Sequence, residues 1–184
     1  SLQTGKPVAV AVPQDYRIKS DITVSLKEGK VTTFTKESVG KALMPYFKTG
    51  NGENNQVVPL KVENGYATIS LPDAEYGFSH LPYGYLNSKR KENLLIPRPV
   101  SEVYTYTIEC PENMELRTPR MYKAISNTAG KLSIIVKKEG RTATVTRSLE
   151  LSKQLYTPAE YKDLRQLLTE WSDVNGKTLL FSVQ

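Results

Sequence analysis

Hydrophobic and polar residues alternate in several short stretches of the chain, a pattern that predicts β strands. Two pairs of such stretches flank residues typical of tight turns: 22–26 and 31–35 around Glu28-Gly29-Lys30, and 57–62 and 66–71 around Glu63-Asn64-Gly65. An Asn-Gly pair, or a glycine between two alternating stretches, favours a two-stranded hairpin. The front part of the chain is therefore predicted to contain two hairpins.

The clearest strand lies in the second half of the chain, at residues 103–109 (VYTYTIE). Its alternation places Tyr104, Tyr106 and Ile108 on one face and the intervening residues on the other. Three more strands follow, with turns between them: 122–125, 131–138 and 141–151. Short strands that succeed one another at this spacing are typical of an antiparallel sandwich or barrel.

The pattern changes to a helical period near the end of the chain. Thr157 is placed to cap a helix, Pro158 suits its first turn, and Glu160 is placed to reach back to the cap. Apolar residues then recur at three- and four-residue spacing: Tyr161, Leu164, Leu167, Leu168, Trp171 and Val174. Asn175-Gly176 is predicted to end this helix. The stripe predicts a helix that docks on a sheet.

Together these patterns predict a mainly β fold, an antiparallel β-sandwich with one C-terminal amphipathic α-helix packed on the sheet. Residues 1–20 are expected to be a tail and lead-in strand (7–12, PVAVAV), and residues 21–184 the sandwich domain. Residues 36–47 are ambiguous between helix and strand, and residues 49–56 (TGNGENNQ) are expected to be a polar loop. The irregular segment 72–99 is the place where a boundary between two subdomains is expected, if the domain has one.

Composition adds few constraints on function. Of the 184 residues, 39% are hydrophobic, which is enough to build a core, and no apolar run is long enough to span a bilayer. No signal-peptide pattern is visible. The net charge is +6, but the basic residues are dispersed apart from Lys89-Arg90-Lys91, which Glu92 follows. A solvated loop explains this cluster better than a nucleic-acid site does.

Candidate chemistry is sparse, because the chain has one cysteine and one histidine. Cys110 and His80 are the only thiol–imidazole pair, and nothing in the sequence predicts that they meet. One histidine, one cysteine and scattered acids do not predict a metal site, and no Gly-rich phosphate loop joins a strand to a helix. We expect no catalytic residues, no metal and no cofactor. Paired carboxylates distant in sequence stay an open alternative.

The aromatic segment 76–85 is the best candidate for recognition. Tyr76, Phe78, Tyr83 and Tyr85 lie in a Pro- and Gly-rich stretch, where flat rings stack on sugars or pack against peptides. The alternative, which we favour, is that these rings cover an open end of the sandwich or pack on a neighbouring domain.

The second half of the chain resembles a known family. The resemblance is carried by these segments: 93–97 (NLLIP), 104–108 (YTYTI), Pro111-Glu112-Asn113, 145–151 (VTRSLEL) and 156–165 (YTPAEYKDLR). They are similar to the C-terminal β-rich domain of bacterial envelope proteins whose middle domain is transglutaminase-like, with a papain-type fold. The resemblance implies a location in the bacterial periplasm or at the cell surface.

The resemblance also implies a role. In the family, the catalytic Cys, His and Asp lie in the middle domain in that order, whereas here His80 precedes Cys110 and neither lies in a matching motif. The first hypothesis is therefore a non-catalytic module that packs against an upstream transglutaminase-like domain or another protein. The alternatives are an independent carbohydrate- or peptide-binding module that uses residues 76–85, and an enzyme built on His80 and Cys110.

Overall fold

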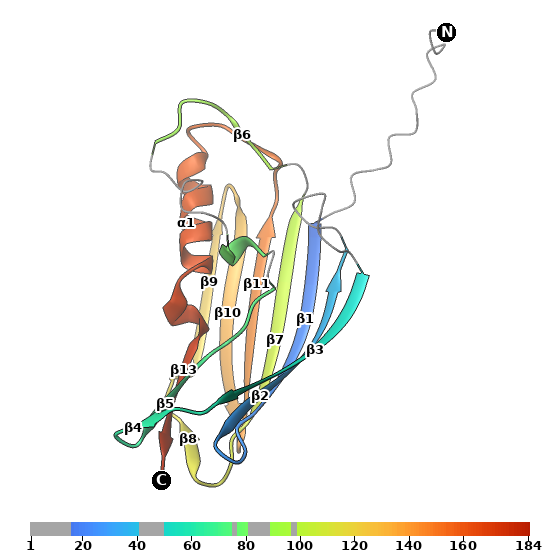
Figure 1. Ribbon diagram of the computed structural model, residues 1–184. Helices are drawn as coiled ribbons and strands as arrows, with labels where there is room; N and C mark the ends of the chain where they lie inside the picture. Colours follow the sequence, from blue (N-terminus) through green and yellow to red (C-terminus); the bar gives the residue numbers. More distant parts are fainter. Residues whose placement is uncertain (1–15, 41–49, 75–76, 81–88, 97–98) are drawn as a thin grey trace, which may run out of the picture.

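The computed structural model describes residues 16–40, 50–74, 77–80, 89–96 and 99–184 (Figure 1). The predicted lead-in strand at residues 7–12 lies outside this part of the chain, as does the segment 41–49. No helix in the described residues has the length and apolar character needed to cross a membrane.

In the described part of the chain, seven strands form one large sheet. From edge to edge they are β3 (Gly50–Pro59), β2 (Lys30–Val39), β1 (Tyr16–Ser25), β7 (Val100–Glu109), β11 (Thr142–Leu151), β10 (Gly130–Glu139) and β9 (Met121–Asn127). Neighbouring strands are antiparallel except β1 and β7, which run parallel over ten residue pairs. This parallel pairing joins strands that precede and follow residues 72–99 in a single sheet.

A second layer covers one side of this sheet (Figure 1). It consists of the helix α1 (Tyr161–Trp171), which contacts β10, and a four-stranded sheet of β4 (Val62–Glu63), β5 (Tyr66–Ser70), β13 (Thr178–Val183) and β8 (Met114–Leu116). Two shorter elements complete the fold: the 3-10 helix η1 (Phe78–His80) and a ladder of β6 (Leu94–Leu95) with β12 (Leu155–Tyr156). The predicted fold class, mainly β with a C-terminal helix packed on a sheet, is confirmed.

The core lies between the two layers because the strands alternate as the sequence predicts. On β7, Tyr104, Tyr106 and Ile108 are fully buried, whereas the residues between them are partly exposed. On α1 the buried residues are Tyr161, Leu164, Leu167, Leu168 and Trp171. The helical stripe therefore packs against the inward faces of the strands, and burial of this apolar surface stabilises the sandwich.

Both predicted hairpins are confirmed by their turns. Glu28 and Gly29 have φ of 57° and 68°, and Asn64 and Gly65 have φ of 53° and 78°. Two successive residues with positive φ form the type I′ turn, whose twist matches that of two antiparallel strands. The second hairpin is shorter than predicted, because Val57 and Val58 pair with β2 rather than with β5.

The prediction of a polar loop at residues 49–56 is wrong, because residues 50–59 form the strand β3. This strand pairs with β2 along its whole length and lies at the edge of the large sheet. Its side chains from Gly52 to Pro59 are exposed, so it buries little apolar surface. Backbone pairing with β2, rather than hydrophobic alternation, holds this polar segment in a strand.

Both ends of the helix differ from the prediction: α1 begins at Tyr161, after a turn at residues 158–160, with Glu160 at the N-cap position and no side-chain cap. At the start, the Thr157 side chain accepts a hydrogen bond from the Glu160 N–H at 3.3 Å, and Glu160 forms an ion pair with Lys153 rather than reaching back. At the other end, α1 stops at Trp171, because Asp173 has an extended backbone and caps the 3-10 helix η3 (Val174–Lys177). Val174 is consequently 68% exposed and does not belong to the buried stripe.

Candidate functional site

The predicted aromatic site is described only at Phe78. The Phe78 side chain is 2% exposed and packs in the hydrophobic core, so its ring presents no face to a ligand. Tyr76, Tyr83 and Tyr85 lie outside the described residues. The binding role of this segment stays a prediction.

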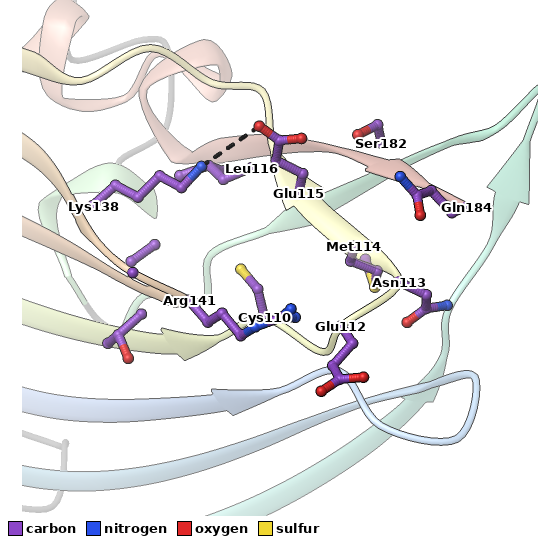
Figure 2. Close-up of a pocket in the computed structure, with 13 residues that line it drawn as sticks. Cys110, Glu112, Asn113, Met114, Glu115, Leu116, Lys138, Arg141, Ser182 and Gln184 are labelled. Atoms are coloured by element: carbon purple, nitrogen blue, oxygen red, sulfur yellow. Dashed lines mark ion pairs between the residues drawn. The ribbon is translucent and has the colours of Figure 1, made fainter.

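Cys110 lines a small cavity next to the end of β7 (Figure 2). The cavity has a volume of about 230 Å³, and Lys138, Arg141 and Glu115 also line it. Lys138 lies 3.8 Å from Glu115, the ion pair drawn as a dashed line in Figure 2. Burial raises the pKa of the Cys110 thiol above its ordinary value, and the charges of Lys138 and Arg141 offset this only in part. The thiol is therefore protonated at neutral pH and a weak nucleophile.

The backbone of His80 lies near the opposite end of β7. His80 belongs to η1, whose first residue, Phe78, donates its N–H to Glu102 at 2.9 Å. Cys110 follows Glu102 by eight residues in an extended chain, a span of about 26 Å at ~3.3 Å per residue. A Cys–His pair needs hydrogen-bond contact, which is about 3 Å.

A cluster of charged side chains is buried between the two layers. Arg147, on β11, donates a hydrogen bond to Asp73 at 2.7 Å, and Lys177 donates to the other carboxylate oxygen at 3.1 Å. The side chains of Arg147 and Asp73 are 0% and 2% exposed. The Arg147 guanidinium also donates to the Trp171 carbonyl oxygen at 2.9 Å and lies 4.4 Å from the centre of the Trp171 ring.

These charges set the ionisation of Asp73. Burial on its own raises the pKa of Asp73, but the charges of Arg147 and Lys177 and a hydrogen bond from Ser79 outweigh burial, so the pKa lies below its usual value. Asp73 is therefore a carboxylate at neutral pH, paired on both oxygens. Such an acid is poorly suited to exchange protons with a substrate.

Glu102 is a second buried acid, with a different environment. It is 0% exposed and accepts hydrogen bonds from the Tyr104 hydroxyl at 2.6 Å and the Phe78 N–H at 2.9 Å. Burial raises the pKa of Glu102 to about 7, because those two hydrogen bonds only partly compensate for lost hydration. At Gly77, a Cβ would lie 2.6 Å from a Glu102 oxygen and 2.9 Å from the Tyr104 hydroxyl, so only glycine fits this close approach.

Residues 66–181 match the family described as a domain of unknown function with a solved structure, DUF3858. The chain belongs to this family. The matched residues contain Asp73, Glu102, Cys110 and Arg147, so the buried charges lie within the DUF3858 domain.

One solved structure similar to this DUF3858 chain is a crystal structure of a "putative protease" from Parabacteroides distasonis. The two are 28% identical in sequence, with a TM-score of 0.58. The match covers 81% of this chain but 30% of the Parabacteroides chain. The region shared with that protein is therefore less than a third of its length. Among curated proteins, the search finds no match.

The buried charges hold parts of the DUF3858 domain together and are not accessible to a substrate. Glu102 connects β7 with η1, and Asp73 connects the segment before η1 with Arg147 on β11. Arg147 in turn donates a hydrogen bond to the end of α1. The role of these charges was not predicted from the sequence, although the sequence contains a signal for it. Glu102 and Arg147 occupy inward-facing positions of alternating strands, two residues from Tyr104 and from Val145 respectively. A charged residue at an inward-facing position of a strand predicts a buried partner.

Within the described residues, no group of three or more His, Cys, Asp or Glu side chains is arranged to hold a metal ion. The described part of the chain thus contains a protonated thiol in a small cavity and a set of buried, mutually paired charges. Neither arrangement provides an activated nucleophile or a metal-bound water.

Proposed function

We propose that this DUF3858 chain is a non-catalytic accessory module of a bacterial envelope protein that carries a transglutaminase-like domain, and that it packs against that domain or against a partner protein. The observation that carries the proposal is the coverage of the similar structure. The fold accounts for most of this chain but for 30% of a much longer bacterial protein described as a protease. The remaining length leaves room for a separate domain that performs the chemistry.

The chemistry of the described residues supports a non-catalytic role. The Cys110 thiol has a raised pKa, and the backbone of His80 lies near the far end of β7. The two acids with strongly perturbed environments, Asp73 and Glu102, are bonded to neighbouring side chains and backbone groups inside the core. Ion pairing explains the lowered pKa of Asp73, and burial explains the raised pKa of Glu102. Both are structural causes, the ordinary alternative to a catalytic role.

The proposed location is the bacterial periplasm or cell surface. It is supported by the resemblance of residues 93–165 to domains of envelope proteins and by the bacterial source of the similar structure. Sequencing the gene upstream of the codon for Ser1 tests both location and role: a segment encoding a Cys–His–Asp domain and a leader is expected there.

The direct test is an activity measurement on the purified chain. We expect no hydrolysis of casein and no incorporation of a primary amine into a glutamine-containing peptide, above the level of a heat-denatured sample. Cys110→Ser and His80→Ala variants are the controls, and both should leave any background rate unchanged. A turnover that Cys110→Ser abolishes would show that the chain is itself an enzyme and would overturn the proposal.

A further inference from the structure

A concave basic surface, which we call the basic groove, lies between residues 89–91 and the exposed side of α1. It has a volume of about 750 Å³. Its lining includes five cationic side chains, which come from two separate parts of the chain: Lys89, Arg90, Lys91, Lys162 and Arg165. The sequence shows only the first three as a cluster. The fold brings the two helical cations to them, so the charge density of the groove is a property of the tertiary structure.

Local contacts hold the two walls of the groove together. The Arg90 guanidinium lies 5.5 Å from the centre of the Tyr161 ring, at the start of α1. A cation over an aromatic face is held by attraction to the ring electrons. Lys162 and Arg165 are exposed and three residues apart, so they lie on the same face of the helix.

The described acidic residues do little to balance Lys89 and Lys91. Among the described residues that line the groove, Glu170 is the one acid, and its carboxylate already forms an ion pair with Lys123 on β9. Lys89 and Lys91 are exposed and form no ion pair with any acid in the described residues. Confining five cations in one concave surface raises the local concentration of anions. The groove is therefore suited to an anionic ligand.

The shape and surroundings of the groove distinguish between anionic partners. A bilayer surface is planar and cannot enter a concave site. Single-stranded nucleic acid is usually held by exposed aromatic rings, but Tyr161 is 3% exposed and is covered by Arg90. An extended polypeptide fits such a groove, with its carboxylates between the two walls.

Exposed apolar residues close in sequence to both walls of the groove, four residues after Lys91 and six before Tyr161, favour a polypeptide as well. Leu95 and Leu155 are directly paired across the β6–β12 ladder and are 64% and 52% exposed. Opposite residues of an antiparallel pair lie on the same face, so the two side chains form one small apolar patch. A peptide offers both carboxylates and apolar side chains.

We propose that the basic groove binds an acidic polypeptide segment, contributed by a neighbouring domain or a partner protein. This inference deepens the packing role proposed above by naming the surface and the chemistry of what packs there. The accessory role and the binding role of the groove can fail separately. An enzymatically active chain that binds the peptide contradicts only the accessory role. An inactive chain that does not bind the peptide contradicts only the binding role of the basic groove.

The test uses fluorescence anisotropy with a labelled peptide of alternating aspartate and serine, at low ionic strength. We expect saturable binding that weakens by about tenfold or more when salt is raised to about 0.5 M, because salt screens exposed charges. A peptide with asparagine in place of aspartate is expected not to bind. Binding that is insensitive to both changes would contradict the proposal.

Charge reversal then locates the site. Lys162→Glu combined with Arg165→Glu is expected to weaken binding by about tenfold or more, as is Lys89→Glu combined with Lys91→Glu on the other wall. The matched control is Lys27→Glu with Lys61→Glu, which reverses two exposed lysines outside the groove and should change affinity by less than about twofold. Equal losses in all three variants would show a nonspecific effect of net charge and would overturn the site.

Two competing ligands complete the test. Vesicles of anionic phospholipid and a single-stranded oligonucleotide are added at matched charge. We expect each to compete with the peptide less well than unlabelled peptide does. If either displaces the peptide more effectively, and the groove variants abolish its binding, the groove serves that class of ligand and the polypeptide assignment is wrong.

Discussion

The buried charges around Asp73 and the exposed charges of the basic groove represent two uses of the same residue types. Arg147 and Lys177 each have a carboxylate oxygen of Asp73 within hydrogen-bond distance, in a site with almost no solvent exposure. In the groove, Lys89, Lys91 and Lys162 are exposed to solvent, and Glu170, the acid among the described lining residues, pairs with a lysine on β9. In the buried set, each cation contacts a carboxylate oxygen of the fold. In the groove, the described lining residues include five cations and one acid, Glu170.

This difference indicates where stability and where binding reside. A buried ion pair is costly to break, because removing one partner leaves the other charge without water. Exposed charges contribute little to stability, since water and salt screen them. We therefore expect substitutions in the buried set to affect unfolding and substitutions in the groove to affect binding. The following predictions test that separation, from the largest expected effect to the smallest.

Trp171→Ala is expected to have the largest effect. The Trp171 ring is fully buried, packs near Tyr104 and lies over Arg147. Its loss should lower the free energy of unfolding by about 3–5 kcal/mol, through lost burial and the cavity that remains. Urea unfolding followed by circular dichroism measures this. Val174→Ala is the control at an exposed position, and an equal loss in both variants would mean that α1 is not docked as described.

Arg147→Ala should come next, with a loss of about 3 kcal/mol in the free energy of unfolding. The loss stays at the low end of the range for a broken buried pair because Lys177 still lies 3.1 Å from Asp73. Arg165→Ala, which removes the same side chain from the groove, serves as the matched control in chemical unfolding. A smaller loss for Arg147→Ala than for Arg165→Ala would reverse the comparison.

The pH dependence of stability should identify Glu102. Its pKa is raised from 4.5 to about 7 in the folded protein, so the folded state binds a proton that the unfolded state releases between these values. The stabilising contribution of protonated Glu102 is fully present below about pH 4.5 and is lost as pH rises through about 7. Between these limits the wild type should lose up to roughly 1.4 kcal/mol per pH unit relative to Glu102→Gln.

Unfolding at a series of pH values for both proteins gives this difference directly. Asp73 does not obscure it, because its lowered pKa places its own effect at lower pH, where stability falls as pH falls. A difference between wild type and Glu102→Gln that does not change between pH 5 and 7 would show that Glu102 is not the titrating group.

Lys162→Glu combined with Arg165→Glu should have the smallest effect on stability. Both side chains are exposed, and we expect the free energy of unfolding to change by less than about 0.5 kcal/mol. Thermal unfolding followed by circular dichroism provides the measurement. A large destabilisation would mean that the charges of the basic groove stabilise the fold, as the buried charges around Asp73 do.

Local pattern predicted much of this fold from sequence. The alternation of Tyr104, Tyr106 and Ile108 identified the buried face of β7, and the period of Tyr161 to Trp171 identified the docked face of α1. These predictions succeeded because burial of one face leaves a periodic trace in the sequence. The prediction for β3 was wrong because backbone hydrogen bonds to β2 hold its polar residues in a strand. Such bonds leave no periodic pattern of hydrophobic residues in the sequence.

The charged clusters depended on tertiary contacts and were only partly predictable. The burial of Glu102 and Arg147 could be detected in the sequence, since each is a charged residue at an inward-facing position of an alternating strand. Their partners could not be assigned, because Asp73 precedes Arg147 by 74 residues. Similarly, Lys89-Arg90-Lys91 was visible as a cluster, but its meeting with Lys162 and Arg165 follows only from the packing of residues 89–91 beside α1.

The most direct test of the account is an amide NMR titration of the chain with the acidic peptide. We predict chemical-shift changes concentrated at residues 89–91 and along the exposed side of α1 at residues 162–169, with Asp73, Glu102 and Arg147 unaffected. Shifts centred on Cys110 and its cavity, or no shifts at the groove, would contradict the assignment of binding to the groove and of the buried charges to the fold.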